Sequence, residues 1–372
     1  MSKTLQDYAT LINDTIQSNE INHYITTDNM RQNLGGIDTL KNINIPQGKV
    51  RSFQKDDVLL SNIRLYFRKV YKAKQKGGCS SDILVFRAKH IDSATLFAIL
   101  SSQIFTDYAC LGSQGSKMPR GNKTHMMDFK IPTINFTIAK IFNSIQNKIE
   151  NNHKINELLH KILELLYEQY FVRFDFLDEN NKPYQTSGGK MKFSKELNRL
   201  IPNDFEVKTL GELTQLKVGN KNANHSSNKG EYPFFTCSNN PLRCETYQFE
   251  GKHIVISGNG NFYVTHYDGK FDAYQRTYVV NPNNQNHYVL IYLFVKSYTN
   301  YLRLQSRGSI IKFITKSDIE NIKIILPNLK TYAKWNNVLK MIENNMQETQ
   351  TLTALRDFLL PLLLTQQVKP PK

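Results

Sequence analysis

The chain has 372 residues, of which 40% are hydrophobic, and this is enough for two ordinary domains with buried cores. Lysine and arginine number 48 against 32 acidic residues, a formal net charge of +16. The basic residues are scattered through patterned segments, which excludes both a disordered chain and a simple basic tail. The sign of the charge favours a polyanionic partner such as nucleic acid, and a merely basic surface is the alternative.

The amino-terminal stretch MSKTLQDYATLINDT is polar and lacks the apolar core of a signal peptide. No later segment of the sequence approaches the roughly 18 consecutive apolar residues of a membrane span. The four cysteines show no Cys-x-x-Cys spacing and have no His-x-x-x-His companion, which argues against a zinc site and a disulfide framework. We therefore expect a cytoplasmic protein with reduced thiols.

Short phrases recur in the same order in the two halves of the sequence, as expected of an internal repeat. The matching pairs are KTLQDYATL at 3–11 with KTLGELTQL at 208–216, DVLLSN at 57–62 with HIVISG at 253–258, FTDY at 105–108 with YTNY at 298–301, and Gly115-Ser116 with Gly308-Ser309. The last two pairs share an offset of 193 residues. The sequence predicts a tandem duplication with an α+β fold, in which two mixed α/β domains occupy residues 1–133 and 205–327.

A segment with helical periodicity follows each copy, at residues 134–174 and 328–372. Apolar residues recur there at three- and four-residue steps, so the first helix should run for about 30 residues, or roughly 45 Å. The second helix should stop or kink at Pro361. Ordinary core helices are the alternative, but the matching positions favour a long antiparallel two-helix coiled coil that separates the two domains.

The seam of this coiled coil is assigned to apolar residues of both helices, with Asn152 near it as a residue that costs stability but fixes the register. The predicted coiled-coil residues are Ile145, Ile155, Leu159, Ile162 and Leu166 in the first helix and Val338, Ile342, Leu352 and Leu359 in the second.

Residues 175–204 connect the first helix to the second domain. Their sequence is rich in Asn, Lys, Ser and Gly and has no periodicity. We expect a tether that lets the second domain start at the end of the helix pair. The paired glycines Gly188-Gly189 then serve the connection and do not form a phosphate cradle.

Cations stand beside aromatic residues or glycines in both copies. The segments are SNIRLYFRKVYKAKQK at 61–76, GSQGSKMPRGNK at 112–123, ISGNGNFYV at 256–264 and SRGSIIKFITKS at 306–317. Guanidinium groups can read guanine edges, lysines neutralise phosphates, and bare backbone amides beside hydroxyls suit phosphate oxygens. For any single residue a solvated surface is the alternative. The candidate DNA-binding residues are Ser61, Asn62, Arg64, Arg68, Lys69, Lys117, Arg120, Lys123, Ser257, Asn259, Asn261, Arg276, Arg307, Ser309, Lys312 and Lys316.

A search for an active site finds no convincing motif. The segment PNDFEVK places Asp204 only two residues before Glu206, whereas two carboxylates that share a magnesium ion normally come from separate strands. NPLR at 240–243 and NPNN at 281–284 lack the second proline and the closing aromatic of the amino-methyltransferase tetrapeptide, so they predict turns. The nine histidines have no metal-ligand spacing. We assign no catalytic residue and no metal site.

Three further segments are distinctive: YFVRFDFLDENNKPYQTSGGKM at 170–191, GSIIKFITKSDIENIKIILPNL at 308–329 and LRDFLLPLLL at 355–364. With these segments as the most specific marks, the chain resembles a specificity subunit of a type I restriction-modification enzyme over nearly its full length. The resemblance implies two target recognition domains, each contacting one half of a bipartite, gapped site in double-stranded DNA. It also implies that the paired helices hold the domains apart and dock other subunits.

The partners that the resemblance implies are two modification (methyltransferase) subunits, which carry S-adenosylmethionine and methylate adenine, with two restriction subunits that use ATP and Mg as a further possibility. The chain itself would bind no cofactor and would be non-catalytic. Two other classes remain open from the sequence: a stand-alone DNA-modifying enzyme, either nuclease or methyltransferase, with an unrecognised site, and a membrane or structural scaffold built on the long helices.

Overall fold

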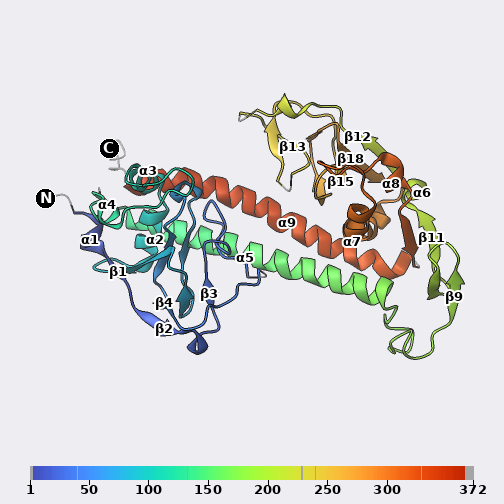
Figure 1. The fold of residues 1–372 in the computed structure, drawn as a ribbon, viewed down its shortest axis with the longest axis horizontal. Helices are drawn as coiled ribbons and strands as arrows, with labels where there is room; N and C mark the ends of the chain where they lie inside the picture. The colour runs from blue at the N-terminus through green and yellow to red at the C-terminus, as the bar shows by residue number, and fades with distance from the viewer. Residues whose placement is uncertain are drawn as a thin grey trace, which may run out of the picture. The chain divides into compact units, whose positions relative to one another are not determined.

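The computed structural model describes residues 3–39, 41–131, 133–227, 229–238, 240–327 and 329–364. The chain divides into two compact units (Figure 1). Unit 1 consists of Met1–Leu158 with Glu343–Lys372, and unit 2 of Leu159–Ile342. Each unit is therefore built from a mixed α/β body and from parts of two long helices, α5 and α9.

The central sheet of unit 1 has four antiparallel strands in the order β1-β8-β5-β6. Side chains alternate between its faces, so Leu84 and Phe86 enter one core cluster while Ile83 and Val85 enter another. Because both faces are covered, the first four residues of β8 are all apolar instead of alternating with polar ones. The strands are β1 (Ala9–Ile12), β5 (Val58–Ser61), β6 (Val70–Lys72) and β8 (Ile83–Ala88).

Short helices cover one face of this sheet and a second small sheet completes unit 1. Polar caps fix where these helices start, since Asp92, Ser102 and Asn122 each accept a hydrogen bond from a first-turn amide. The helices are α1 (Leu5–Tyr8), α2 (Ser93–Ser101), α3 (Gln103–Leu111) and α4 (Lys123–Met127). The second sheet has the order β2-β4-β7-β3, from β2 (Thr15–Gln17), β3 (Tyr24–Ile25), β4 (Lys49–Phe53) and β7 (Gly77–Cys79).

Unit 2 repeats the central sheet of unit 1 strand for strand, in the order β12-β18-β15-β16 and again antiparallel throughout. Its side chains alternate in the same way, with Ile254 and Val280 in one cluster and Val255 and Val279 in another. The strands are β12 (Thr214–Val218), β15 (Lys252–Ser257), β16 (Val264–Asp268) and β18 (Thr277–Pro282). The predicted duplication and mixed fold are confirmed.

Some of the remaining elements of unit 2 also have counterparts in unit 1. A parallel strand pair occurs in the second sheet of both, β3 with β7 and β13 with β17. The elements are β11 (Glu206–Thr209) paired with β19 (Lys323–Leu326), β14 (Leu242–Cys244), β13 (Tyr232–Phe235), β17 (Asp272–Ala273), α6 (Leu210–Leu213), α7 (Tyr288–Gln305) and α8 (Lys316–Glu320). Where unit 1 has α2 and α3, interrupted at Ser102, unit 2 has the single helix α7.

Two long helices confirm the predicted periodic segments: α5 (Phe136–Tyr167) and α9 (Leu329–Leu359). Asn135 starts α5, because its Oδ1 accepts hydrogen bonds from the amides of Thr137 and Ile138. A π-helical turn, Glu168–Val172, follows α5. The α-helical part of α9 ends just before Pro361, as expected from the lost amide donor, and continues as the 3-10 turn Leu360–Leu364.

Within unit 1 the two helices pack antiparallel through polar side chains. Asn152 Nδ2 donates to Glu348 Oε2 at 2.8 Å, and Asn345 Nδ2 donates to Asn156 Oδ1 at 2.9 Å. Asn152 is 1% exposed, so the prediction that it lies near the seam is confirmed. Within unit 2 the contact between the helices is apolar instead, and the buried residues of the same cluster include Leu163, Leu339 and Ile342.

The structure differs from the predicted seam at two positions. Ile155 and Ile162 are 42% and 45% exposed, so they point away from the contact face. The contact face lies about one residue further round α5, at Asn152, Asn156 and Leu163. Counting apolar residues alone missed it because part of that face is polar. Of the other predicted residues, Ile145 and Ile342 are buried, and Leu159, Leu166, Val338, Leu352 and Leu359 are half-buried.

The segment predicted as a tether, residues 175–204, is ordered. Asp175 accepts hydrogen bonds from the amide and hydroxyl of Thr186, which closes the first turn. The ring of Phe176 stacks between those of Tyr184 and Phe205, with centroid distances of 4.9 and 5.4 Å. The strands β9 (Met191–Ser194) and β10 (Arg199–Pro202) then form a hairpin. The prediction of an unstructured connection missed this because side chain–backbone bonds and ring stacking leave no periodic pattern.

Among the described residues, no single helix is both long enough and apolar enough to cross a membrane. The helices α2 and α3 meet that test only when they are counted together across a bend of 62°.

Candidate nucleic-acid interface

A loop in unit 1 brings together two segments that the sequence proposed separately. Residues 114–120, the glycine–serine loop of unit 1, are closed by reciprocal backbone hydrogen bonds of 2.9 and 2.8 Å between Gln114 and Arg120. The loop docks on the turn after β5, where the amide of Arg64 donates to the carbonyl of Pro119 at 2.9 Å. The amide of Gly121 donates to the carbonyl of Asn62 at 3.1 Å. The segments at 61–76 and 112–123 therefore form one surface.

Unit 2 contains the same construction. Its glycine–serine loop, residues 307–313, is closed by reciprocal backbone bonds of 3.0 and 2.8 Å between Arg307 and Phe313. It docks on the turn after β15, where the amide of Gly260 donates to Lys312 O at 2.9 Å and the amide of Ile314 donates to Gly258 O at 2.9 Å. Four backbone hydrogen bonds thus occupy equivalent positions in the two units. Such repeated docking indicates that both loops are held in a defined conformation.

The glycine that opens each loop has a backbone that other residues rarely adopt. Gly115 and Gly308 have φ of 98° and 97°, respectively. The serine after each glycine, Ser116 and Ser309, is exposed. The repeated Gly-Ser pair of the sequence therefore marks the sharp turn at the start of each loop.

Exposed cations surround both loops. Arg120 is held by Asp82, with Nη1 2.8 Å from Oδ1, and Arg307 is held by Asp318, with Nη2 3.3 Å from Oδ1. Burial alone would raise the pKa of Asp318. The hydrogen bonds from Thr315 and the charge of Arg307 outweigh burial and lower this pKa, which keeps the ion pair charged. Both guanidinium groups are more than half exposed and keep further N–H donors for a ligand. Lys117, Lys123, Lys312 and Lys316 are exposed as well.

Several predicted residues face inward and stabilise the surface from beneath. Ser61 is buried and its Oγ donates to Ile63 O at 3.0 Å, while Ser257 is also buried. Arg68 Nη2 donates to Ser101 O at 2.9 Å, and Lys69 Nζ donates to Thr27 O at 2.5 Å. Burial lowers the pKa of both Arg68 and Lys69.

Here the structure departs from the sequence prediction. Ser61, Ser257, Arg68 and Lys69 have their polar atoms directed into the protein, so in this conformation they are not free to contact DNA. Asn62 is buried beside them. In unit 1 this could not be predicted from the residue types, because left-handed backbone at Arg64 and Arg68, both with φ of 49°, turns the segment between them.

The other predicted residues of unit 2 lie on the surface. Asn261 and Arg276 are exposed and Asn259 is half-buried. Asn261 Nδ2 donates to the hydroxyl of Tyr263 at 3.0 Å. The side chains of Ile310 and Ile311, to which the sequence analysis assigned no role, are exposed here as well. Their position directly after the repeated Gly-Ser pair was the signal that could have revealed them.

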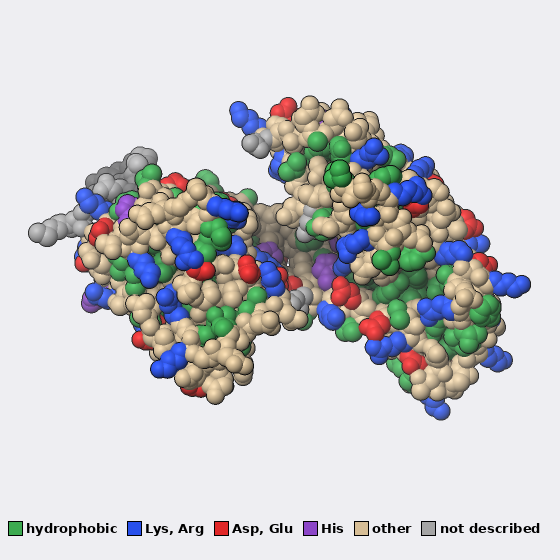
Figure 2. Space-filling model, viewed as in Figure 1, with side chains coloured by type: hydrophobic (Ala, Val, Ile, Leu, Met, Phe, Trp, Pro, Cys, Tyr) green, Lys and Arg blue, Asp and Glu red, His purple; other side chains and the backbone are tan. Residues whose placement is uncertain are grey.

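On the face that Figure 2 shows, the charged side chains are spread out and do not form one basic stripe. Figure 2 shows Lys and Arg side chains distributed over the visible surface of both units, with Asp and Glu between them. The local arrangement at each loop therefore carries more information about binding than the total charge does.

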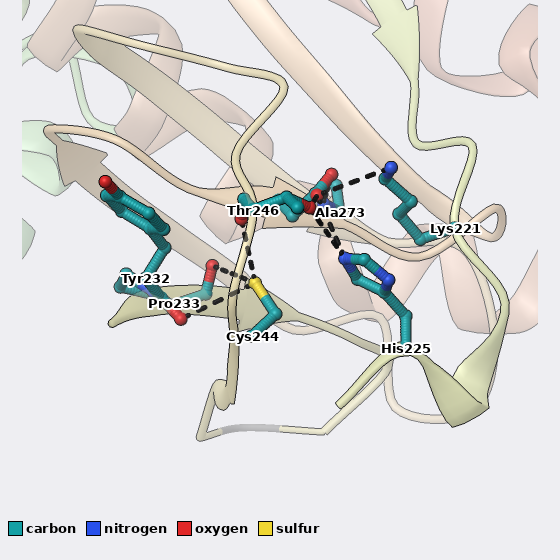
Figure 3. Close-up of polar contacts among 8 residues, drawn as sticks. Lys221, His225, Tyr232, Pro233, Cys244, Thr246 and Ala273 are labelled. Atoms are coloured by element: carbon teal, nitrogen blue, oxygen red, sulfur yellow. Dashed lines mark hydrogen bonds and ion pairs between the residues drawn. The ribbon is translucent and has the colours of Figure 1, made fainter. Parts of the chain in front are cut away.

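One group of three possible metal-ligating side chains occurs within the described residues, in the second sheet of unit 2 (Figure 3). His225 Nε2 lies 3.2 Å from Asp272 Oδ2, which also accepts from Thr246 Oγ1 at 3.0 Å. Lys221 Nζ is 3.8 Å from the same carboxylate oxygen, so the buried charge of Asp272 is already balanced.

The third member, Cys244, has its sulfur among backbone carbonyl oxygens. Sγ lies 3.1 Å from Thr246 O, 3.6 Å from Tyr232 O and 3.8 Å from Pro233 O. Burial raises the pKa of this thiol, and carbonyl oxygens repel a thiolate. The cluster therefore fits a hydrogen-bonded support for the second sheet better than a zinc site. The prediction of no metal site stays a prediction.

Comparison with known proteins finds a matching domain and similar chains. Residues 202–355 match the type I restriction modification DNA specificity domain. The specificity subunit of the type I restriction enzyme EcoDI from Escherichia coli is 38% identical over 133 residues, which are 34% of this chain and 29% of that subunit. The MjaIX specificity subunit from Methanocaldococcus jannaschii is 23% identical over 309 residues, which are 74% of this chain and 69% of that subunit.

A solved structure shares the fold. The crystal structure of the type I restriction-modification S subunit from M. genitalium covers 99% of this chain and 96% of that one, with a TM-score of 0.62 and 16% identity. The chain thus has the fold of that S subunit, and residues 202–355 are similar to the DNA specificity domain. The resemblance to type I specificity subunits drawn from the sequence is confirmed as a similarity.

Proposed function

We propose that this chain is the sequence-specific DNA-binding subunit of a type I restriction-modification complex, and that each unit contacts one half of a bipartite, gapped site in double-stranded DNA. The observation that carries the proposal is the repeated glycine–serine loop, docked by four equivalent backbone hydrogen bonds and flanked by exposed cations in both units. Phosphate contacts from the lysines and arginines would position the DNA, and the loops would contact base edges.

The chain itself would be non-catalytic and would bind no cofactor. Methylation of adenine would come from two modification subunits that carry S-adenosylmethionine, and flipping the base out of the duplex would bring it to their active sites. Two restriction subunits that use ATP and Mg would add cleavage. Because the substrate is cellular and incoming DNA, the complex would work in the cytoplasm.

Exposed apolar side chains on the long helices support docking of such subunits. Ile162 and Leu165 of α5 are exposed in unit 2, and Leu355 and Phe358 of α9 are exposed in unit 1. Large apolar side chains repeated along helix faces are typical of interfaces between proteins. Each pair would give a modification subunit an apolar contact.

The test is to express the chain with the modification subunits of its own system and to map adenine methylation across the genome. We expect one gapped motif to be methylated only when this chain is present. Purified complex should bind a duplex with that motif more tightly than one with a scrambled half-site, and the affinity should fall steeply with salt. Methylation that is the same with and without the chain contradicts the proposal.

A further inference from the structure

The two glycine–serine loops differ at their tips although their frames are the same. Each tip contains five residues between the bridged positions, 115–119 in unit 1 and 308–312 in unit 2. After the shared Gly-Ser pair, unit 1 continues with Lys117 and Met118, whereas unit 2 continues with Ile310 and Ile311. At the third tip position the two equivalent scaffolds therefore present a lysine in unit 1 and an isoleucine in unit 2.

The apolar pair of unit 2 is exposed to an unusual degree. Ile310 is 94% and Ile311 is 61% exposed. The loop cannot fold these side chains inward, because the reciprocal bonds of Arg307 with Phe313 and the bond from Gly260 to Lys312 O fix its backbone. A rigid turn that holds two branched apolar side chains in water is stabilised when a ligand covers them.

The surroundings indicate which ligand covers this pair. Arg307 and Lys312 flank it and are exposed, so the approach of a polyanion is favoured on both sides. Isoleucine has no hydrogen-bond donor or acceptor, so it cannot read amino or carbonyl groups on bases. The feature of a base edge that suits it is the C5-methyl group of thymine in the major groove.

We propose that Ile310 and Ile311 determine specificity by apolar contact with a thymine methyl group in the half-site of unit 2. At the equivalent place in unit 1 stands Lys117, which can donate hydrogen bonds but has no apolar surface comparable to that of the isoleucine pair. The same loop position therefore contacts the two half-sites through different chemistry. This inference rests on the proposed function, because it requires that the chain contacts DNA.

The experiment uses the full complex with its modification subunits and the gapped duplex found by methylation mapping. Each thymine of each half-site is replaced in turn by deoxyuridine, which removes only the methyl group, and affinity is measured. We expect one such replacement, in a single half-site, to weaken binding by about tenfold, in the range of a lost base contact. The double variant Ile310→Lys with Ile311→Met, which installs the tip of unit 1, should bind the thymine and deoxyuridine duplexes equally.

A matched control is Leu304→Lys, which makes the same change of chemistry at another exposed position of unit 2 outside the loop tip. It should keep the preference for thymine. A second variant, Ile310→Ala with Ile311→Ala, removes the contact without adding charge, and because both residues are exposed it should leave thermal unfolding unchanged.

Three results would overturn the inference. The first is that no replacement of thymine by deoxyuridine, in either half-site, weakens binding. The second is a tip variant that keeps the full thymine preference. The third is a tip variant that loses assembly with the modification subunits while base preference is retained, which would make the tip a protein contact. Failure of the proposed function is distinct, because then the unaltered chain itself would confer no motif.

Discussion

The two units use one architecture but stabilise the long helices in different ways. In unit 1 the α5–α9 contact runs through hydrogen bonds, including those of Asn152 with Glu348 and of Asn345 with Asn156. In unit 2 it runs through the apolar residues Leu163, Leu339 and Ile342. Hydrogen bonds depend on precise pairing, whereas apolar burial tolerates small shifts. The polar half therefore specifies the register of the helices and the apolar half contributes more of the stability.

The same contrast appears at the loops. Equivalent backbone bonds close and dock both glycine–serine loops, but the tips carry Lys117 in one unit and Ile310 in the other. Duplication has kept the parts that position the loop and changed the parts that point outward. Three changes to single residues test how far the two units really differ.

The largest effect is expected from Leu163→Asp in the apolar half. Leu163 is fully buried, so an unpaired carboxylate there should destabilise unit 2 by about 4 kcal/mol or more. Denaturant unfolding of the full chain, followed by circular dichroism, measures it. The matched control is the adjacent Ile162→Asp, which lies on the exposed face and should change stability by less than about 1 kcal/mol. An equal loss of stability in both variants would mean that Ile162 also lies in the seam, as the sequence predicted.

A smaller loss is expected from Arg356→Ala in the polar half. Arg356 is 2% exposed, and its Nη1 donates to Asn33 O at 3.2 Å and to Gln146 Oε1 at 3.3 Å. Its removal leaves those acceptors unpaired, so unit 1 should lose about 2–4 kcal/mol. Thermal unfolding measures the loss against Arg173→Ala, which removes an exposed ion pair and should cost below about 1 kcal/mol. An unchanged unfolding temperature for Arg356→Ala would mean that the polar contacts do not hold α9 in unit 1.

The smallest effect compares Gly308→Ala with Gly115→Ala. Both glycines have positive φ, so each substitution should cost about 1 kcal/mol from the backbone alone. A Cβ at Gly308 would lie 2.3 Å from Ile311 O, whereas at Gly115 the nearest atom, Met118 O, is 3.6 Å away. Gly308→Ala should therefore disturb its loop more.

Amide hydrogen exchange separates the two loops. In Gly308→Ala the amides of Arg307 and Phe313 should exchange faster, and in Gly115→Ala the amides of Gln114 and Arg120 should change less. If both pairs respond equally, the two loop frames are closer in packing than the Cβ distances indicate.

Much of the fold could be predicted from the sequence because it depends on patterns. The repeated phrases gave the duplication, and the three- and four-residue spacing gave α5 and α9. The offset of 193 residues between the Gly-Ser pairs located two loops that the structure shows to be equivalent. Periodicity and repetition are local properties, so they survive without coordinates.

What could not be predicted depends on contacts between distant residues. Asn156 and Arg356 take part in the polar helix contact, but a count of apolar positions gives them no weight. Arg68 looked like a DNA contact because it is basic, yet its partner Ser101 O lies 33 residues away in sequence. The sequence analysis assigned no role to the exposed Ile310, because a sequence does not show which side of a turn faces water.

Unit 1 is built from two separate parts of the chain, and this affects the order in which the two units can fold during synthesis on the ribosome. Leu360, Leu363 and Leu364 belong to the same buried cluster as Leu96 and Phe142, so the core of unit 1 stays open until residues 360–364 emerge. Unit 2 is one uninterrupted segment, Leu159–Ile342, and all of its residues leave the ribosome earlier. The half that is translated first therefore closes last, and its apolar core is incomplete during elongation.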